Sequence, residues 1–268
     1  MSQETKNIVI MNFSGVYESM HLKGENLQRI ECRDIEGTNC YCDDEAIQTI
    51  KERLLPFKET RIHFIDSGNY HYMTRIWTDF IKDDFDLIVF DNHTDMQPPA
   101  FGGLLSCGGW IASVLSENPH LHRVILIGPS EEDYQTVDED LKQRVLFISR
   151  EMLSAARTDK TDFSRILESY MESLFQEKTS SDRLLPVYLS IDKDILNKNE
   201  IQTNWSQGDM TFTELHLMLQ TVLDRLIKEN RKLLGLDICG EGEEYSSNSE
   251  EINKALLEQV VKSFTRQP

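Results

Sequence analysis

Two stretches of the sequence place metal-binding side chains directly after an apolar run. In Phe85–Met96, the run Leu87–Phe90 is followed by Asp91, His93 and Asp95. Side chains alternate along an extended chain, so these three can project to the same side. Two carboxylates and an imidazole suit a hard or borderline divalent cation such as Mn²⁺. The spacing therefore predicts one half of a metal site.

The stretch Val187–Leu196 repeats the pattern, because its apolar run ends in Asp192 and Asp194. If the two runs are neighbouring strands, four carboxylates and a histidine gather around one spot. Such a cluster of anions is repulsive unless cations lie among them. One divalent ion would leave two negative charges unbalanced, whereas two ions would balance all four. The two stretches together predict a site for two metal ions.

The apolar runs of the chain are continuous rather than alternating, which is typical of strands buried on both faces of a parallel sheet. They lie at Ile8–Phe13, Ile62–Ile65, Leu87–Phe90, Val124–Ile127, Val145–Ile148, Val187–Ile191 and Leu233–Ile238. In an open parallel sheet, ligands bind at the edge formed by the carboxyl ends of the strands. The predicted ligands come at such ends.

Amphipathic helices alternate with these strands. Their apolar positions indicate helices over Met73–Ile81, Phe163–Phe175, Leu215–Leu226 and Leu256–Phe264. The last two are each preceded by a predicted capping box, Thr211 with Glu214 and Ser247 with Glu250. Strands alternating with helices, without a Pro- or Gly-rich linker, predict one α/β domain over residues 1–268. We expect a three-layer α/β/α sandwich with a mainly parallel sheet.

The overall composition excludes several classes of function. The chain has 268 residues, of which 28 are basic and 46 acidic, giving a net charge of −18. That charge disfavours nucleic acid as a partner and favours cationic small molecules. No apolar run is long enough to span a membrane, and the polar start does not resemble a signal peptide. The five cysteines show no paired spacing, which indicates free thiols and a location in the reducing cytoplasm.

The two metal-binding stretches resemble the motifs of the ureohydrolases, the family of arginase, agmatinase and formimidoylglutamase. That family carries DAHxD and, later, SxDxDxxDP; this chain has DNHTD at Asp91–Asp95 and SIDKD at Ser190–Asp194. The resemblance runs from about Ile62 to Glu241 and implies an arginase-like α/β/α fold. Beyond the motifs it is faint, so the chain is identified as a divergent member.

The resemblance also implies a full ligand set. His71, in a segment similar to the family's GGDHS, becomes the sixth ligand. One ion would bind His71, Asp91, Asp95 and Asp192, and the other Asp91, His93, Asp192 and Asp194. Two Mn²⁺ ions are implied, with Zn²⁺, Fe²⁺ or Co²⁺ as alternatives. A hydroxide bridging the ions would attack the sp² carbon of an amidine, guanidine or amide, and Asp95 would pass the proton to the leaving amine.

Three positions depart from the family pattern, and all concern the substrate. Cys107 stands where the family has a proton-shuttling histidine, a role that a thiol cannot simply take over. It would contact the substrate, act as an activated nucleophile or merely fill space. Glu241 comes one residue later than the family's guanidinium-binding acid, so it either holds the substrate or belongs to an acidic loop. Asn197-Lys198 replaces the family's Asp-Pro.

The main hypothesis is therefore a binuclear metal-dependent hydrolase that cleaves a non-peptide C–N bond of a small, cationic molecule. One alternative is an amide hydrolase with a single Zn²⁺, similar to histone deacetylases, which share a related fold. The other is a metal-binding protein that has lost catalysis and serves as a partner or sensor, a reading motivated by Cys107. Members of the family often form assemblies of identical subunits, so the resemblance also suggests a homo-oligomer, although no interface signature is visible in the sequence.

Overall fold

The computed structural model describes residues 8–22, 27–98, 102–158, 165, 168–169, 172 and 184–266. Within these residues, eight strands form one sheet in the order β2-β1-β4-β10-β9-β5-β7-β8, and every pairing in it is parallel. The strands are β1 (Ile8–Asn12), β2 (Leu27–Glu31), β4 (Ile62–Ser67), β5 (Phe85–Phe90), β7 (Leu121–Ile127), β8 (Val145–Ile148), β9 (Val187–Asp192) and β10 (Leu233–Glu241). All seven predicted strands are present, and β2 is added at one edge.

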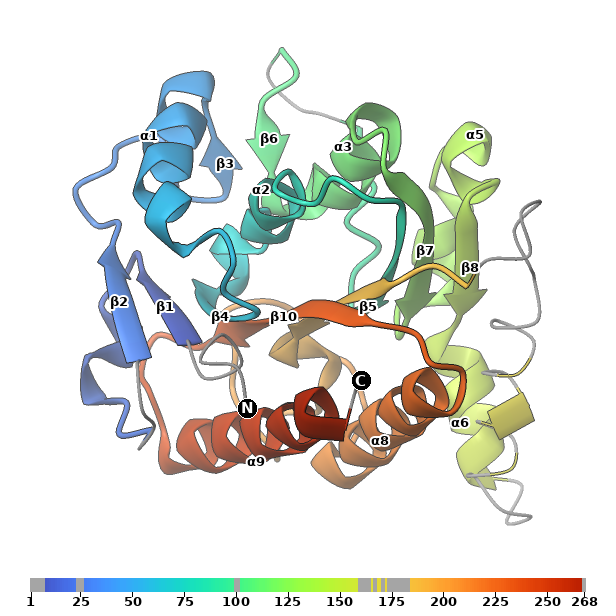
Figure 1. Ribbon diagram of the computed structural model, residues 1–268. Helices are drawn as coiled ribbons and strands as arrows, with labels where there is room; N and C mark the ends of the chain where they lie inside the picture. The colour runs from blue at the N-terminus through green and yellow to red at the C-terminus, as the bar shows by residue number, and fades with distance from the viewer. Residues whose placement is uncertain are drawn as a thin grey trace.

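Helices cover both faces of this sheet (Figure 1), which confirms the three-layer α/β/α fold. One face carries α1 (Asp44–Leu54), α2 (Met73–Thr78) and α3 (Trp110–Glu117), and the other carries α8 (Phe212–Lys228) and α9 (Ser247–Arg266). Shorter helices are α4 (Glu131–Gln135), α5 (Glu139–Lys142) and α6 (Arg150–Thr158). A separate antiparallel pair joins β3 (Tyr41–Cys42) to β6 (Leu105–Ser106) above the first face.

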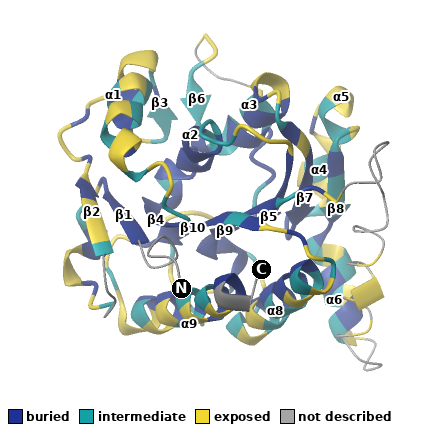
Figure 2. Cartoon of the chain, in the orientation of Figure 1, coloured by how far each residue is buried: buried dark blue, intermediate teal, exposed yellow. Residues whose placement is uncertain are grey.

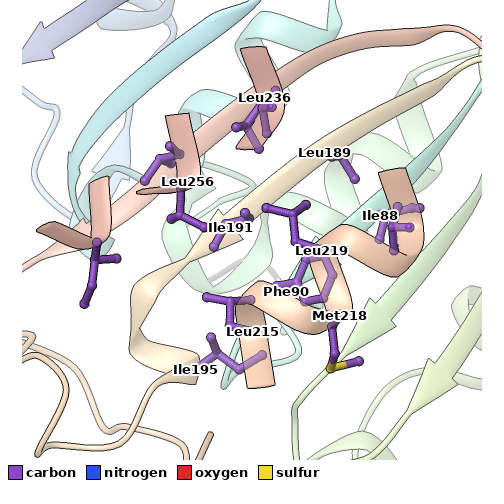
Figure 3. Close-up of a cluster of buried hydrophobic side chains, with 14 of the residues drawn as sticks. Ile88, Phe90, Leu189, Ile191, Ile195, Leu215, Met218, Leu219, Leu236 and Leu256 are labelled. Atoms are coloured by element: carbon purple, nitrogen blue, oxygen red, sulfur yellow. The ribbon is translucent and has the colours of Figure 1, made fainter. Parts of the chain in front are cut away.

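The central strands are buried on both faces, as their continuous apolar runs predict. Along β5, Ile88 and Phe90 pack towards α8 and α9, whereas Leu87 and Val89 pack towards α2 and α3. Figure 3 shows the first of these cores, where side chains of β5, β9 and β10 meet α8 and α9. The exposed residues lie mainly on the outer helical surfaces, in loops and on the edge strand β2 (Figure 2).

The helix ends agree only in part with the sequence. Thr211 caps α8 through a capping box with Glu214, as predicted. The box predicted at Ser247 is wrong, because Ser246 caps α9: its Oγ accepts a hydrogen bond from the backbone N–H of Ser249 at 3.0 Å. Helix α2 ends at Thr78 rather than at Ile81. The helix predicted at Phe163–Phe175 falls largely outside the described residues.

The parallel arrangement brings the carboxyl ends of β4, β10, β9 and β5 to one edge of the sheet. Strand β9 lies between β10 and β5, with Ile191 directly opposite Phe90. The segments that follow β5 and β9 therefore start side by side. Among the described residues, no helix is long and apolar enough to cross a membrane.

Candidate metal centre

The six predicted ligands come together at the carboxyl edge of the sheet. Asp91 directly follows β5, Asp192 ends β9, and Asp194 lies in the 3-10 turn Lys193–Ile195 that follows. His71 follows β4 and the 3-10 turn Gly68–Tyr70, and β10 lies between β4 and β9 in the sheet. The four aspartates and His71 are buried, and His93 is partly exposed.

His71 is the centre of the first ligand cluster. Its Nδ1 lies 3.1 Å from Asp91 Oδ2, 3.2 Å from Asp95 Oδ2 and 3.4 Å from Asp192 Oδ2. One nitrogen thus faces three carboxylate oxygens at close range. A single imidazole proton cannot satisfy three acceptors, so the arrangement fits a cation held between these atoms.

His93 is the centre of the second cluster. Its Nδ1 lies 2.8 Å from Asp194 Oδ2 and 3.6 Å from Asp91 Oδ1. Asp91 therefore takes part in both clusters, with one oxygen turned towards each histidine. A shared carboxylate between two ligand groups is what a site for two neighbouring ions requires.

Two serines fix the orientation of the histidine rings. His71 Nε2 lies 2.9 Å from Ser190 Oγ, and His93 Nε2 lies 2.7 Å from Ser206 Oγ. When each Nε2–H donates to its hydroxyl, each Nδ1 keeps a lone pair directed at the carboxylates. Such outer hydrogen bonds select the tautomer that can bind a metal. Ser206 is 113 residues from His93 in the sequence, and it was not among the predicted site residues.

The segment that carries His93 and Asp95 is not extended. Strand β5 ends at Phe90, and Asp95 has a left-handed backbone with φ of 48°. The alternation expected from an extended chain therefore does not explain why these side chains converge. Instead, Trp110 Nε1 donates to Asp95 Oδ2 at 2.6 Å and the Asp95 carbonyl accepts from the Ile111 N–H at 2.9 Å. The start of α3 thus holds Asp95 in place.

Burial and close contact shift the pKa values of the carboxyl and imidazole groups in the two clusters. Burial, and then the charge of Asp91, raises the pKa of Asp95 to about 6. Burial is also the main cause that raises the pKa values of Asp194 and Asp192. For His93, burial opposes protonation, but hydrogen bonds to Asp194 and Asp91 outweigh it and raise the pKa to about 12. In the absence of cations, protons bound to these carboxyl and imidazole groups would therefore have to offset the repulsion between the carboxylates.

The residues present fit divalent metal ions. Asp91 Oδ2 is buried and accepts no hydrogen bond within the described structure, although burial of such an atom is costly unless it has a partner. Four carboxylates with two imidazole nitrogens form a donor set typical of Mn²⁺ and related ions. Both observations are explained if ions take the place of the missing partners.

A cavity of about 220 Å³ opens over the two clusters. Besides the ligands, its described lining is mostly neutral and includes Gln97, Ser106, Cys107 and Trp205. Asp133, exposed at the start of α4, adds a carboxylate at the rim. The described lining contains no Lys or Arg. Trp205, whose ring meets that of His93 edge-on at 5.9 Å between centroids, is another site residue that the sequence did not indicate.

Cys107 lies in this cavity, at the start of the 3-10 turn that leads into α3. Burial, and then the charge of Asp95, raises the pKa of its thiol well above the ordinary value. The thiol is therefore protonated at neutral pH, which argues against the reading of Cys107 as an activated nucleophile. Its position still allows contact with a substrate.

Glu241 does not lie in the cavity, and both expectations for it are wrong. It ends β10, is fully buried, and its Oε1 accepts hydrogen bonds from Lys193 Nζ and, at 2.7 Å, from Asn253 Nδ2 of α9. The preceding Gly240 faces the metal centre with φ of 89°, and a Cβ there would lie 2.1 Å from Asp192 Oδ1. Strand β10 thus presents no side chain where the guanidinium-binding acid was expected.

Comparisons with known proteins identify a family and a shared fold. The family model described as "Arginase family" matches residues 10–257. An uncharacterized protein of Thermotoga maritima is 29% identical over 255 residues, covering 94% of this chain and 88% of its own. The structure of proclavaminate amidino hydrolase from Streptomyces clavuligerus is similar with a TM-score of 0.66 and 15% identity, over 98% of this chain and 93% of that one. Trypanosoma cruzi formiminoglutamase with Mn²⁺ is similar with a TM-score of 0.64 and 14% identity, over 100% and 96%.

Proposed function

The chain belongs to the arginase family, and we propose that it is a metal-dependent hydrolase that cleaves a C–N bond of an amidine, guanidine or amide. The observation that carries the proposal is the pair of ligand clusters joined by Asp91 beneath a cavity. We assign His71, Asp91, Asp95 and Asp192 to one ion and Asp91, His93, Asp192 and Asp194 to the other. Manganese is the preferred metal, in keeping with the donor set and with the Mn²⁺ named for the T. cruzi relative.

The two ions, when bound, would lower the pKa of a water molecule and polarise the carbon under attack. The protein's own contribution is to hold the ligands and to move a proton. Asp95 is suited to the second task, because its carboxylate faces the cavity and is held by Trp110. Its place in the cavity lining would let it accept a proton from the attacking water and pass it to the leaving amine.

The cavity lining supports a cationic or neutral substrate. No Lys or Arg lines the described part of the cavity, so a substrate carboxylate would find no oppositely charged partner there. Asp133 at the rim and the net charge of −18 favour a positively charged group instead. Because β10 presents Gly240 and Cys107 replaces the family histidine, we propose that the substrate differs from arginine.

The single-zinc alternative is less well supported. A mononuclear site needs only one group of ligands around one ion, whereas this chain has two histidine-centred clusters that share Asp91. If the protein bound only one Zn²⁺ and turned over acetyl-lysine, that alternative would replace ours. Two bound ions without turnover of any amidine or amide would favour a metal-binding protein that has lost catalysis.

Metal content and turnover test the proposal together. The protein would be loaded with Mn²⁺, freed of excess metal and analysed for bound ions, and then supplied with a panel of amidines, guanidines and amides while ammonia and urea are measured. We expect two ions per chain and turnover of at least one compound. Fewer than one bound ion after loading would contradict the proposal.

Two variants test the ligand assignment. Asp91→Ala and Asp192→Ala should each abolish binding of both ions, because each side chain is assigned to both. Asp83→Asn, at an exposed position away from the cavity, is the matched control and should bind two ions. Loss of only one ion in either alanine variant would show that the residue does not bridge.

A further inference from the structure

Two cysteines face each other across the antiparallel pair β3–β6. The register pairs Tyr41 with Ser106 and Cys42 with Leu105, so the next opposed pair is Cys40 with Cys107. The Cys107 N–H donates to the Cys40 carbonyl at 2.9 Å, which extends the ladder to this pair. The two positions are 67 residues apart in the sequence, and the spacing of the cysteines gave no hint that they meet.

The distance between opposed residues suits a covalent link. In an antiparallel ladder, a hydrogen-bonded pair has its Cα atoms about 5.5 Å apart. Disulfides join Cα atoms that are about 4.4–6.8 Å apart, a range that includes this spacing. Cys40 lies just outside β3 with φ of 61°, and the hydrogen bond from the Cys107 N–H holds the two backbones together there. The two side chains also interact with each other directly. The pair therefore meets the geometric requirement for a disulfide.

Access from solvent distinguishes this pair from the other cysteines. Cys40 and Cys107 both line the cavity over the metal centre, and Cys40 is partly exposed. Cys32, Cys42 and Cys239 are buried and do not line that cavity. A small oxidant that enters the cavity therefore meets this pair, with Cys40 as the more accessible thiol.

We propose that Cys40 and Cys107 are a site of reversible disulfide formation at the mouth of the metal cavity, with a peroxide as the oxidant. The sulfur of Cys40 attacks one oxygen of hydrogen peroxide, the O–O bond breaks, and a sulfenic acid and one water are formed. The Cys107 thiol is protonated at rest, so its proton passes to the hydroxyl group of the sulfenic acid as its sulfur attacks Cys40 Sγ, and a second water leaves. Two thiols are oxidised by one peroxide, and a dithiol reductant restores them.

The disulfide would act on the metal centre through α3. Cys107 is three residues before Trp110, whose indole N–H holds Asp95, and the link would tie this segment to β3. The oxidised pair would also remove the Cys107 thiol from the substrate's reach. If the proposed hydrolase function holds, oxidation changes KM, and reduction restores it. Disulfide formation itself does not depend on that function.

Peptide mass spectrometry under native conditions tests the site directly. The folded protein would be treated with hydrogen peroxide, alkylated and digested without reduction. We expect a cross-linked peptide that joins Cys40 to Cys107, with loss of two hydrogens, and its disappearance after treatment with dithiothreitol. Cys40→Ser and Cys107→Ser should each lack the cross-link, whereas the matched control Cys239→Ser should form it as the unchanged protein does.

Two results would overturn the proposal. One is oxidation of Cys40 to sulfinic acid without any cross-link, which would show that Cys107 cannot reach it. The other is a cross-link through Cys42, whose side chain is buried towards Tyr72. Because the cross-link is read without turnover, its absence would leave the hydrolase proposal standing, and its presence would not depend on it.

Discussion

Replacement of Glu241 by Gln removes one charge from a fully buried ion pair. The ammonium of Lys193 contacts Glu241 Oε1 and lies 3.0 Å from Asn253 Oδ1, and neither charged side chain is exposed. Lys193 stands between the predicted ligands Asp192 and Asp194, but it does not line the cavity, and its ammonium is directed to Asn253 of α9. We therefore expect the change to destabilise the fold and to loosen the metal site, without touching the substrate.

The size of the effect follows from burial. Removing one partner of a buried ion pair leaves an uncompensated charge and costs about 3–5 kcal/mol. At about 4 kcal/mol, the ratio of folded to unfolded protein falls by roughly a thousandfold. The double change Lys193→Met with Glu241→Leu removes both charges. It should recover most of that loss, because apolar replacements of a buried pair are often neutral or stabilising.

Chemical denaturation of the metal-free protein measures this prediction. The midpoint should fall clearly for Glu241→Gln and return towards the original value in the double variant. Glu243→Gln, two residues further on and exposed, is the matched control and should change the free energy of unfolding by less than about 0.5 kcal/mol. Unchanged stability in Glu241→Gln together with a raised KM would refute the reasoning and return Glu241 to the substrate.

Three further predictions concern the metal centre. Ser206→Ala should weaken Mn²⁺ binding roughly 10–100-fold in calorimetry, because His93 loses its orienting partner; an unchanged affinity would contradict this role, and exposed Ser116 provides the control. Trp110→Phe should weaken binding and lower Tm, since the buried Asp95 loses a hydrogen bond worth about 1–3 kcal/mol; equal affinity and equal Tm would count against it. Metal uptake by the metal-free protein would also be measured as a function of pH. Uptake should decrease at pH values below about 6, because the raised pKa of Asp95 leaves its carboxyl increasingly protonated there. Uptake that is constant down to pH 5 would exclude Asp95 as a ligand.

Strands buried on both faces were predictable because their apolar runs have no polar interruption. Strand β2 was not, because it lies at the edge of the sheet and only Ile30 of its five residues is buried. Its sequence, LQRIE, therefore carries no strong signal. The same limit applies to β3 and β6, which have two residues each. Short or exposed strands depend on partners that are distant in the sequence.

The candidate ligands were predictable because they follow two buried strands, but the reasons for their convergence were not. Asp95 reaches the centre through a left-handed backbone and the indole of Trp110, neither of which is visible as a periodic pattern. Glu241 was misjudged for a related reason. Cys239 faces the α2–α3 side, and regular alternation would turn Glu241 the same way, but the left-handed backbone at Gly240 directs it towards α9.

The placement of the tryptophans gives the protein an optical reporter of its own state. Of the three in the chain, Trp110 donates to Asp95 and Trp205 lies against His93, whereas Trp77 stacks on His63 at the far end of the sheet. Emission from the first two should respond when ions enter, and a paramagnetic ion such as Mn²⁺ should quench it. The exposed Trp205 would also sense a molecule entering the cavity. Loading of the metal centre and occupation of the cavity could thus be followed by fluorescence before any substrate is known.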